Sequence, residues 1–389
     1  MNAAVYLQKG KHGTVERGHP WIFPKSILRQ NSTQTGKLVQ VYSVDNKLLG
    51  VGIYNEHSLY RVRMLAYEFE KIDVSSIESI VIYRLNQASK LRKNIGLPNK
   101  STTAYRLVNS EGDLLSGLTI DVFNEIYVVS STAYWVEANK ENIIKAINEN
   151  LKPKKIIWFS QPKPLSQDGW KEDINNDTEG TVEVLEGGVK YQVDFSNTQK
   201  TGLFIDQREN HQRIAALASG KKVLDLYSYT GGFALHAALA SAHSVTAVDS
   251  SAAAIELAKG NALLNNISNI NFIEADARDY LVHAKDYDLI ILDPPKLVPS
   301  QRHLNRAKNY YRFLHQELFK SMKSGALLMT CNCSSALSTQ EFKELVSAQA
   351  TNQGKVARII GVYGPSSCHP TLAFFPEGSY LTAILLAVM

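Results

Sequence analysis

The most constraining stretch of the sequence consists of two apolar runs, 222–227 and 244–249, on either side of a Gly-Gly pair at 231–232. Each run has the length and the apolar character of a strand buried on both faces. The glycines permit a tight turn before a helix over 233–242. Because the second run ends at Asp249, the whole stretch predicts a βαβ unit that binds a nucleoside through its ribose.

Two tyrosines distinguish this turn from the usual dinucleotide-binding turn. Tyr227 and Tyr229 occupy positions where glycines would line a pyrophosphate. A cofactor that contains adenosine but no phosphates fits better, which indicates S-adenosylmethionine (SAM). A Gly-Gly turn also occurs in purely structural βαβ units. Evidence from the rest of the sequence is therefore needed to distinguish a SAM-binding unit from a structural one.

Length and composition set broader limits. A chain of 389 residues, 44% hydrophobic and 20% charged, is typical of a globular protein with two or three domains. No apolar run approaches membrane-spanning length, so we expect no membrane partner. Three cysteines without a CxxC pair indicate neither a disulfide framework nor a metal site, and they favour a cytoplasmic location.

The N-terminal 66 residues consist of short β-rich runs separated by turn residues, which predicts a small all-β domain. Residues 1–65 contain nine basic side chains and three acidic ones. This excess indicates contact with a polyanion, although a well-solvated basic surface would carry the same charge.

Two segments of this region, 9–13 and 17–23, resemble a PUA domain, the pseudo-barrel attached to many RNA-modifying enzymes. Trp21 and Phe23 could stack on a base, but we assign both to the core because so small a barrel needs aromatic residues there. The RNA contacts that we expect instead are Lys11, Arg17 and His19.

The middle of the chain is predicted to be an α+β domain without chemistry of its own. We expect a helix over 73–94, capped by Asp73 or Ser75, and a second helix around 136–150. The polar segment 161–181 is expected to be a loop, and a hairpin over 182–195 follows it.

From residue 196 onward, strands and helices alternate, as in a parallel sheet with helices on both faces. The strands are predicted at 222–227, 244–249, 271–274, 289–293, 326–331, 357–363 and 381–388. Seven strands, the last two joined without a helix, match the Rossmann-like sheet of class I methyltransferases. The predicted fold class is therefore multidomain α/β: a PUA-like β-barrel over 1–70, a central α+β domain over 71–195 and a methyltransferase domain over 196–389.

Each of the first four strands of this domain has an aspartate at its end or just beyond it. Because the carboxyl ends of parallel strands meet at one edge, these four aspartates should lie together. We expect Asp225 to bind the methionine amino group of SAM, Asp249 the ribose hydroxyls and Asp276 the adenine amine. One such aspartate is often only a helix cap, but capping does not explain four.

The fourth aspartate, Asp293, opens an Asp-Pro-Pro-Lys segment that predicts where the methyl acceptor binds. Consecutive prolines lack N–H groups, so they end the strand and leave carbonyl oxygens at the rim that can hold a planar base. Amino-group and cytosine-C5 methyltransferases both use such a loop, so it does not name the reaction.

The fifth strand favours methylation of carbon. Carbon 5 of a pyrimidine becomes nucleophilic only after a thiolate adds at carbon 6, and Cys331 and Cys333 occupy this strand end. Strand alternation directs both side chains the same way, but Cys333 lies beyond the strand and should be the more exposed. We predict Cys333 as the nucleophile, Cys331 as a packing residue and no role for Cys368.

Five motifs make a family resemblance specific: 199–210, 226–233, 293–296, Cys333-Ser334 and 369–380. Together they resemble, in domain order and over essentially the whole chain, the PUA-bearing large-subunit rRNA cytosine-C5 methyltransferases, the RlmI-like family. The chain departs from the family pattern at two positions. Cys331 precedes Asn332, and Ser335 replaces a glycine.

The resemblance implies 5-methylcytosine formation in 23S rRNA, with Cys333 as nucleophile and Asp293 binding the base. RNA is the implied partner, with Lys296 among its contacts, and we also expect a homodimer and no metal. The SAM-binding residues implied are Asp225, Tyr227, Ser228, Thr230, Gly231, Gly232, Asp249, Ser250, Asp276, Ala277, Asp293 and Thr201.

Two alternatives remain open on the sequence. One is an amino-group RNA methyltransferase, for guanine-N2 or adenine-N6, that uses the Asp-Pro-Pro loop without a thiolate. The other is a non-catalytic SAM-binding ribosome-assembly factor, against which the intact acids at four strand ends argue. A covalent adduct with 5-fluorocytosine RNA would form only by the thiolate route.

Overall fold

The computed structural model describes residues 3–176, 178–196, 203–297 and 304–389. It divides the chain into two compact units. The N-terminal unit comprises Met1–Val182, Asp194–Gly202 and Cys368–Gly378, and the C-terminal unit comprises Glu183–Val193, Leu203–Ser367 and Ser379–Met389. Among the residues described, no helix is both long and apolar enough to cross a membrane.

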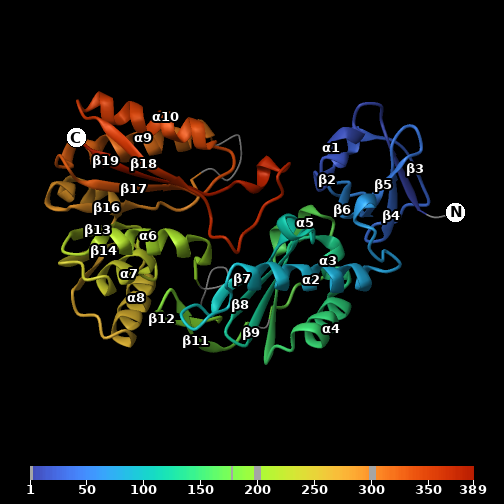
Figure 1. Cartoon of the computed structure of the whole chain (residues 1–389), viewed down its shortest axis with the longest axis horizontal. Helices are drawn as coiled ribbons and strands as arrows, with labels where there is room; N and C mark the ends of the chain where they lie inside the picture. Colours follow the sequence, from blue (N-terminus) through green and yellow to red (C-terminus); the bar gives the residue numbers. More distant parts are fainter. Residues whose placement is uncertain (1–2, 177, 197–202, 298–303) are drawn as a thin grey trace. The chain divides into compact units, whose positions relative to one another are not determined.

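The N-terminal unit begins with a six-stranded sheet in the order β2-β6-β5-β4-β1-β3 (Figure 1). Its strands are β1 Ala4–Leu7, β2 Trp21–Ile22, β3 Ile27–Asn31, β4 Leu38–Tyr42, β5 Leu48–Tyr54 and β6 Val62–Tyr67. The prediction of a β domain is confirmed. A short helix, α1 (His12–Glu16), and strands β2 and β3 were not anticipated.

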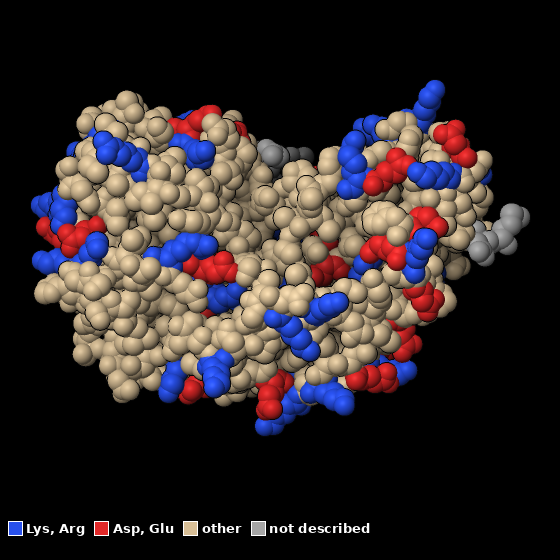
Figure 2. All heavy atoms as spheres, viewed as in Figure 1, with Lys and Arg blue, Asp and Glu red and all other residues tan. Residues whose placement is uncertain are grey.

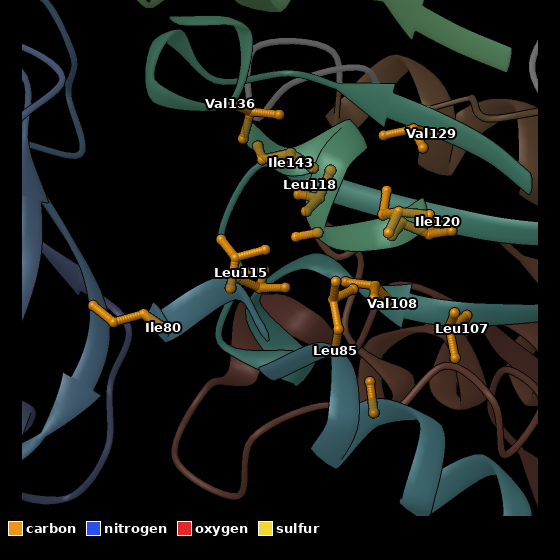
Figure 3. Close-up of a cluster of buried hydrophobic side chains, with 14 of the residues drawn as sticks. Ile80, Leu85, Leu107, Val108, Leu115, Leu118, Ile120, Val129, Val136 and Ile143 are labelled. Atoms are coloured by element: carbon orange, nitrogen blue, oxygen red, sulfur yellow. The ribbon is translucent and has the colours of Figure 1, made fainter. Parts of the chain in front are cut away.

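The central part of this unit is a four-stranded sheet, β10-β9-β8-β7, with helices packed on it. Its strands are β7 Ala104–Asn109, β8 Leu118–Phe123, β9 Ile126–Ser131 and β10 Lys155–Ser160. Aliphatic side chains from the strands and helices meet in one core (Figure 3). Figure 3 shows Leu85 of helix α2 (Ile77–Asn94) beside Val108 of β7.

Three predictions for this region need correction. Ser76 caps α2, because its Oγ accepts the N–H of Ser79 at 3.0 Å. Asp73 instead accepts the N–H of Ser75 outside the helix. The helix expected at 136–150 is two helices, α3 (Tyr134–Ala138) and α4 (Lys140–Leu151).

The third correction concerns the expected loop at 161–181, which contains helix α5 (Pro162–Gln167). Its two prolines lie in the first turn, where a missing N–H costs nothing and the fixed φ suits the helix. The prolines therefore start a helix here and do not prevent one.

The C-terminal unit is built on a seven-stranded sheet in the order β15-β14-β13-β16-β17-β19-β18. All pairs are parallel except those of β19, which is antiparallel to β17 and β18. The strands are β13 Lys222–Leu226, β14 Ser244–Asp249, β15 Ile270–Glu274, β16 Leu289–Leu292, β17 Leu327–Asn332, β18 Ala357–Tyr363 and β19 Thr382–Val388. The seven predicted strands and the final antiparallel pair are confirmed.

Helices cover both faces of this sheet (Figure 1). They are α6 Arg208–Ala218, α7 Gly232–Leu239, α8 Ala252–Leu264, α9 Leu304–Ser321 and α10 Thr339–Asn352. Alternate strand residues enter two separate cores: Leu224 and Leu226 pack with α9 and α10, whereas Val223 packs with α6 and α7. The continuous apolar character of the strands follows from this double burial.

A two-stranded hairpin, β11 (Thr181–Glu186) and β12 (Val189–Asp194), precedes this sheet in the chain. The sequence analysis assigned all of it to the central domain, but Glu183–Val193 belongs to the C-terminal unit. Two asparagines explain the difference. Asn261 of α8 accepts the N–H of Gln192 at 3.0 Å, and Asn265, directly after α8, donates to the carbonyl of Lys190 at 2.7 Å.

Conversely, the segment Cys368–Gly378 between β18 and β19 belongs to the N-terminal unit. Arg92 of α2 donates to the carbonyl of Cys368 at 2.9 Å, and Asn109 donates to that of Pro370 at 2.9 Å. The ring of Phe375 meets Trp21 edge-on at 4.7 Å. Cys368 is fully buried there, and its lack of a role in chemistry stays a prediction.

Candidate active site

The strand register brings the predicted acids to one edge of the seven-stranded sheet. Leu226 at the end of β13 pairs with Val248 of β14 on one side and with Leu292 of β16 on the other. Asp249 and Asp293 therefore follow in equivalent positions on the two strands that flank β13. The expected convergence of these strand ends is confirmed, and it creates the usual ligand position of an open α/β sheet.

The turn after β13 has an unusual backbone. Tyr227 and Tyr229 lie in the left-handed region, with φ of 66° and 48°, and Gly231 follows with φ of 86°. Bulky residues rarely adopt this conformation, and its occurrence twice in three residues stores strain of the kind found at binding sites. Asp249 holds the turn by accepting the N–H of Tyr229 on Oδ2 at 2.9 Å.

Asp225 lies fully buried beneath this turn. Its Oδ2 accepts the N–H of Ala234 at the start of α7 at 3.0 Å, whereas Oδ1 has no hydrogen-bond partner within the described ranges. Burial, with the nearby charges of Asp293 and Asp249, raises the pKa of Asp225 to about 8. The buried Oγ of Ser228 is likewise unpartnered among those residues.

These unpartnered atoms fit a bound SAM. A buried polar atom without a partner costs free energy, and an ammonium group would supply both a hydrogen-bond donor and a compensating charge for Asp225. Asp225 would therefore hold the methionine amino group and Asp249 the ribose hydroxyls. Asp249 also accepts the N–H of Ser251 on Oδ1 at 2.9 Å, yet each carboxylate oxygen can accept a second hydrogen bond.

Asp276 differs from the other acids because its carboxylate is already engaged. It caps the 3-10 helix Ala277–Asp286 and accepts the backbone N–H of Arg278 at 2.9 Å. The guanidinium of Arg278 pairs with it and lowers the pKa of the carboxyl. The capping role that the sequence analysis considered is thus present, and contact with adenine stays a prediction.

The remaining predicted cofactor residues occupy the same loops. Thr230 and Ala277 are buried, Gly232 begins α7, and Ser250 is exposed after β14. Thr201 lies outside the described residues.

The two cysteines of β17 occupy different environments. Cys331 is fully buried within the strand and pairs with Ala383, and burial raises the pKa of its thiol well above the usual range. Cys333 lies one residue beyond the strand end and is half-buried. Its Sγ lies 3.9 Å from Oδ1 of Asp293. The predicted contrast in exposure between the two cysteines is confirmed.

Asp293 is held by a chain of polar side chains. Gln207 donates from Nε2 to Asp293 Oδ2 at 3.0 Å, and Asn210 donates to Gln207 Oε1 at 2.6 Å, which fixes the orientation of the Gln207 amide. Burial, followed by the charge of Asp206, raises the pKa of Asp293 to about 6. Asp206 itself accepts the hydroxyl of Tyr380 at 2.8 Å.

Sequence reasoning did not assign roles to Gln207, Asn210, Asp206 or Tyr380. All four lie in two of the motifs that carry the family resemblance, 199–210 and 369–380. Membership in those motifs was the available signal, but the sequence gives no indication that these polar residues converge on Asp293.

Family models match both the N-terminal part and the C-terminal part of the chain. A family model described as S-adenosylmethionine-dependent methyltransferase matches residues 155–362, more than half of the chain. A PUA-like domain model matches residues 5–67. The chain belongs to the S-adenosylmethionine-dependent methyltransferases.

Similarity to curated relatives extends over the whole length of this methyltransferase. Relatives named "Ribosomal RNA large subunit methyltransferase I" include one from Vibrio vulnificus, 32% identical over 402 residues that cover all of both chains. Another, from Alteromonas mediterranea, is 33% identical over all of this chain and 99% of the relative. These relatives confirm the family resemblance recognised in the sequence.

Solved structures confirm the fold of the methyltransferase. SMU.776 complexed with SAH superimposes with a TM-score of 0.83 at 21% identity, over all of both chains. A Streptococcus mutans protein gives a TM-score of 0.81 at 21% identity, also over all of both chains. At this identity the likeness concerns the fold alone.

A buried asparagine shapes the turn that carries Cys333 in this methyltransferase. Asn332 donates from Nδ2 to the carbonyl oxygens of Ser334 and Leu337, at 3.2 and 3.0 Å. The Tyr311 hydroxyl donates to its Oδ1 at 3.4 Å. Asn332 is therefore a positioning residue that the sequence analysis did not recognise.

The predicted RNA contacts of the methyltransferase differ in exposure. Lys11, Arg17 and Lys296 are exposed, and the Arg17 guanidinium lies 4.3 Å from the centre of the Phe374 ring. His19 is only 9% exposed and accepts the N–H of Trp21 on Nδ1 at 3.2 Å. On the face shown in Figure 2, basic side chains of the N-terminal sheet lie beside acidic ones.

Proposed function

We propose that this methyltransferase transfers a methyl group from SAM to carbon 5 of a cytosine in large-subunit ribosomal RNA. The observation that carries the proposal is the placement of a half-buried thiol, Cys333, 3.9 Å from the Asp293 carboxylate at the ligand edge of the sheet. The names of full-length relatives support ribosomal RNA as the substrate. The cytoplasm is the proposed location, since the substrate is ribosomal RNA.

Asp293 transfers protons for both the Cys333 nucleophile and the cytosine base. With a pKa of about 6, it can accept a proton and return it near neutral pH. It takes the thiol proton of Cys333 on Oδ1 and passes a proton to N3 of the cytosine. The thiolate then adds to carbon 6, because protonation at N3 withdraws electrons from the ring.

The remaining steps restore the enzyme. Bound SAM supplies an electrophilic methyl group, which carbon 5 of the resulting enamine accepts. A base or water removes the proton from carbon 5, and the bond between carbon 6 and Cys333 Sγ breaks. The N3 proton returns to Asp293 Oδ1 and passes from there to the departing Cys333 thiolate, so that thiol and carboxylate regain their starting state. Gln207 keeps Asp293 oriented throughout by its hydrogen bond to Oδ2.

RNA that contains 5-fluorocytosine tests the reaction, because fluorine at carbon 5 cannot leave as a proton does. We expect a covalent complex that survives denaturing electrophoresis with the wild type and with Cys331→Ala. Cys333→Ala should give none. If the wild type forms no adduct and its product carries the methyl on an exocyclic nitrogen, the amino-group route replaces this proposal. A folded protein that binds SAM but methylates no RNA would favour the assembly-factor alternative.

We propose in addition that two copies associate through β18. This strand is the edge of the seven-stranded sheet, and its side chains Ile359, Ile360 and Val362 are 44%, 55% and 40% exposed. Two such edges can pair antiparallel about a two-fold axis. Light scattering should show a dimer that Ile360→Lys converts to a monomer, and a monomeric wild type would reject this interface.

A further inference from the structure

A second group of chemically active side chains lies outside the catalytic rim. Glu186 comes from β11, His211 from α6 and His236 from α7, three elements that are distant in sequence. The three side chains are almost completely buried, with residue exposures of 0%, 3% and 4%. One oxygen or nitrogen atom of each lies within 4.8 Å of the others.

We propose that Glu186, His211 and His236 bind a divalent transition-metal cation of the zinc class. Two imidazoles and one carboxylate form a donor set typical of zinc, whereas calcium and magnesium prefer sites made of oxygen atoms alone. This assignment differs from the expectation of the sequence analysis, in which no metal site was foreseen.

The distances suit such a site with a small adjustment. Glu186 Oε1 lies 3.4 Å from His236 Nε2 and 2.6 Å from His211 Nδ1. Ligand atoms around a tetrahedral zinc ion lie about 3.4 Å apart, given bonds of about 2.0–2.1 Å. His236 already has this spacing. His211 is closer because its Nδ1 is hydrogen-bonded to Glu186 Oε1, and a cation replacing the proton of that bond would separate the pair by less than about 1 Å.

Glu186 Oε2 has no hydrogen-bond partner in the described part of the chain, and His236 Nε2 has only its 3.4 Å contact with Glu186 Oε1. Leaving buried polar atoms unsatisfied is costly, and a cation would engage both.

A glycine next to the cluster leaves room for it. Gly187 has φ of +57°, and a Cβ there would lie 3.0 Å from Cε1 of His236. His211 in turn packs against the start of α7, because a Cβ on Gly232 would lie 2.6 Å from its Cε1 and Nε2. A cation at this site would therefore join hairpin β11–β12 to the helix that follows the SAM-binding turn.

The experiment uses the full chain without a histidine tag. After removal of loose metal, elemental analysis should find about one zinc ion per chain, and Co²⁺ in its place should give the visible absorption of a tetrahedral site. Added Zn²⁺ should raise the Tm of the apo protein by several degrees, because the cation binds only the folded state. A chelator should reverse the shift.

His236→Leu is the matched variant, since it keeps the side-chain volume and removes one ligand. It should lose both the bound zinc and the Tm response, whereas His243→Leu, at an exposed position of the same unit, should keep both. The proposal is overturned if the wild type neither retains nor responds to Zn²⁺ and Co²⁺, in which case the cluster is only a hydrogen-bonded ion pair. Equal metal binding by His236→Leu would also overturn it. The wild-type titration is decisive even if the variant does not fold.

Discussion

Cys333 Sγ and Asp293 Oδ1 lie 3.9 Å apart, each just beyond the end of one of two adjacent parallel strands, β17 and β16. Two residues earlier on β17, Cys331 is fully buried, and burial raises its thiol pKa well above the usual range. The chain thus has two closely spaced thiols near one carboxylate, and only Cys333 is partly exposed.

The first prediction separates these thiols. Cys333→Ala should abolish methyl transfer while SAM and RNA binding persist, since a small half-buried side chain contributes little packing. Cys331→Ala should remain active and lose about 1 kcal/mol of unfolding free energy through a small cavity. Methyl transfer to RNA and urea unfolding measure the two effects. An active Cys333→Ala protein together with a folded but inactive Cys331→Ala protein would reverse the assignment.

The second prediction concerns the ribose end of the cofactor site. Asp249→Ala should weaken SAM binding by roughly 1–3 kcal/mol, because a charged acceptor is lost and the turn at Tyr229 loses its hydrogen bond. Calorimetry measures the affinity. Glu274→Ala is the control, since Glu274 pairs with Asp249 in the register but is exposed. Unchanged affinity in Asp249→Ala would reject the ribose contact.

The third prediction follows from the pKa of Asp225. That pKa is about 8 in the folded protein and 3.8 for the free carboxyl, so the folded state retains a proton that the unfolded state has released. Stability of the protein without SAM therefore falls as pH rises from about 4 to about 8. Asp225→Asn lacks this titration, so its unfolding free energy relative to wild type should increase as pH rises, by on the order of 1–3 kcal/mol between pH 6.5 and pH 8.

Urea unfolding at pH 6.5 and pH 8 measures this difference. Asp293 contributes little to it, because its pKa of about 6 confines its effect to lower pH. The same variant should bind SAM more weakly, since it cannot offer a negative charge to the methionine amino group. A wild type and variant with parallel pH dependences would show that Asp225 is ionised in the folded protein.

The fourth prediction concerns RNA. Replacement of both Lys11 and Arg17 by Ala should weaken RNA binding and reduce the slope of log K against log salt by about 1.5, because two exposed charges are lost. SAM affinity should not change. Lys145→Ala is the control, since Lys145 pairs with Glu78 on the surface of the central domain. An unchanged salt slope in the double variant would place the RNA contacts elsewhere.

The sequence alone determined the architecture of the SAM-binding domain. Its strands are buried on both faces, so their apolar runs are unbroken and their number, limits and order of appearance can be read directly. The acids at the strand ends follow from the same logic, because parallel strands must end at one edge. The contrast between Cys331 and Cys333 was also predictable, since it depends on the position of the strand end.

The tertiary structure decided what depends on contacts between distant segments. Hairpin β11–β12 joins the C-terminal unit through Asn261 and Asn265, and no local pattern marks those side chains as its partners. Gln207 meets Asp293 across 86 positions of sequence. Glu186, His211 and His236 converge although their spacing matches no metal motif. Packing determines which polar side chains distant in sequence form hydrogen bonds with one another. The same residue types are also common on exposed surfaces, so the sequence does not show which of them are buried together.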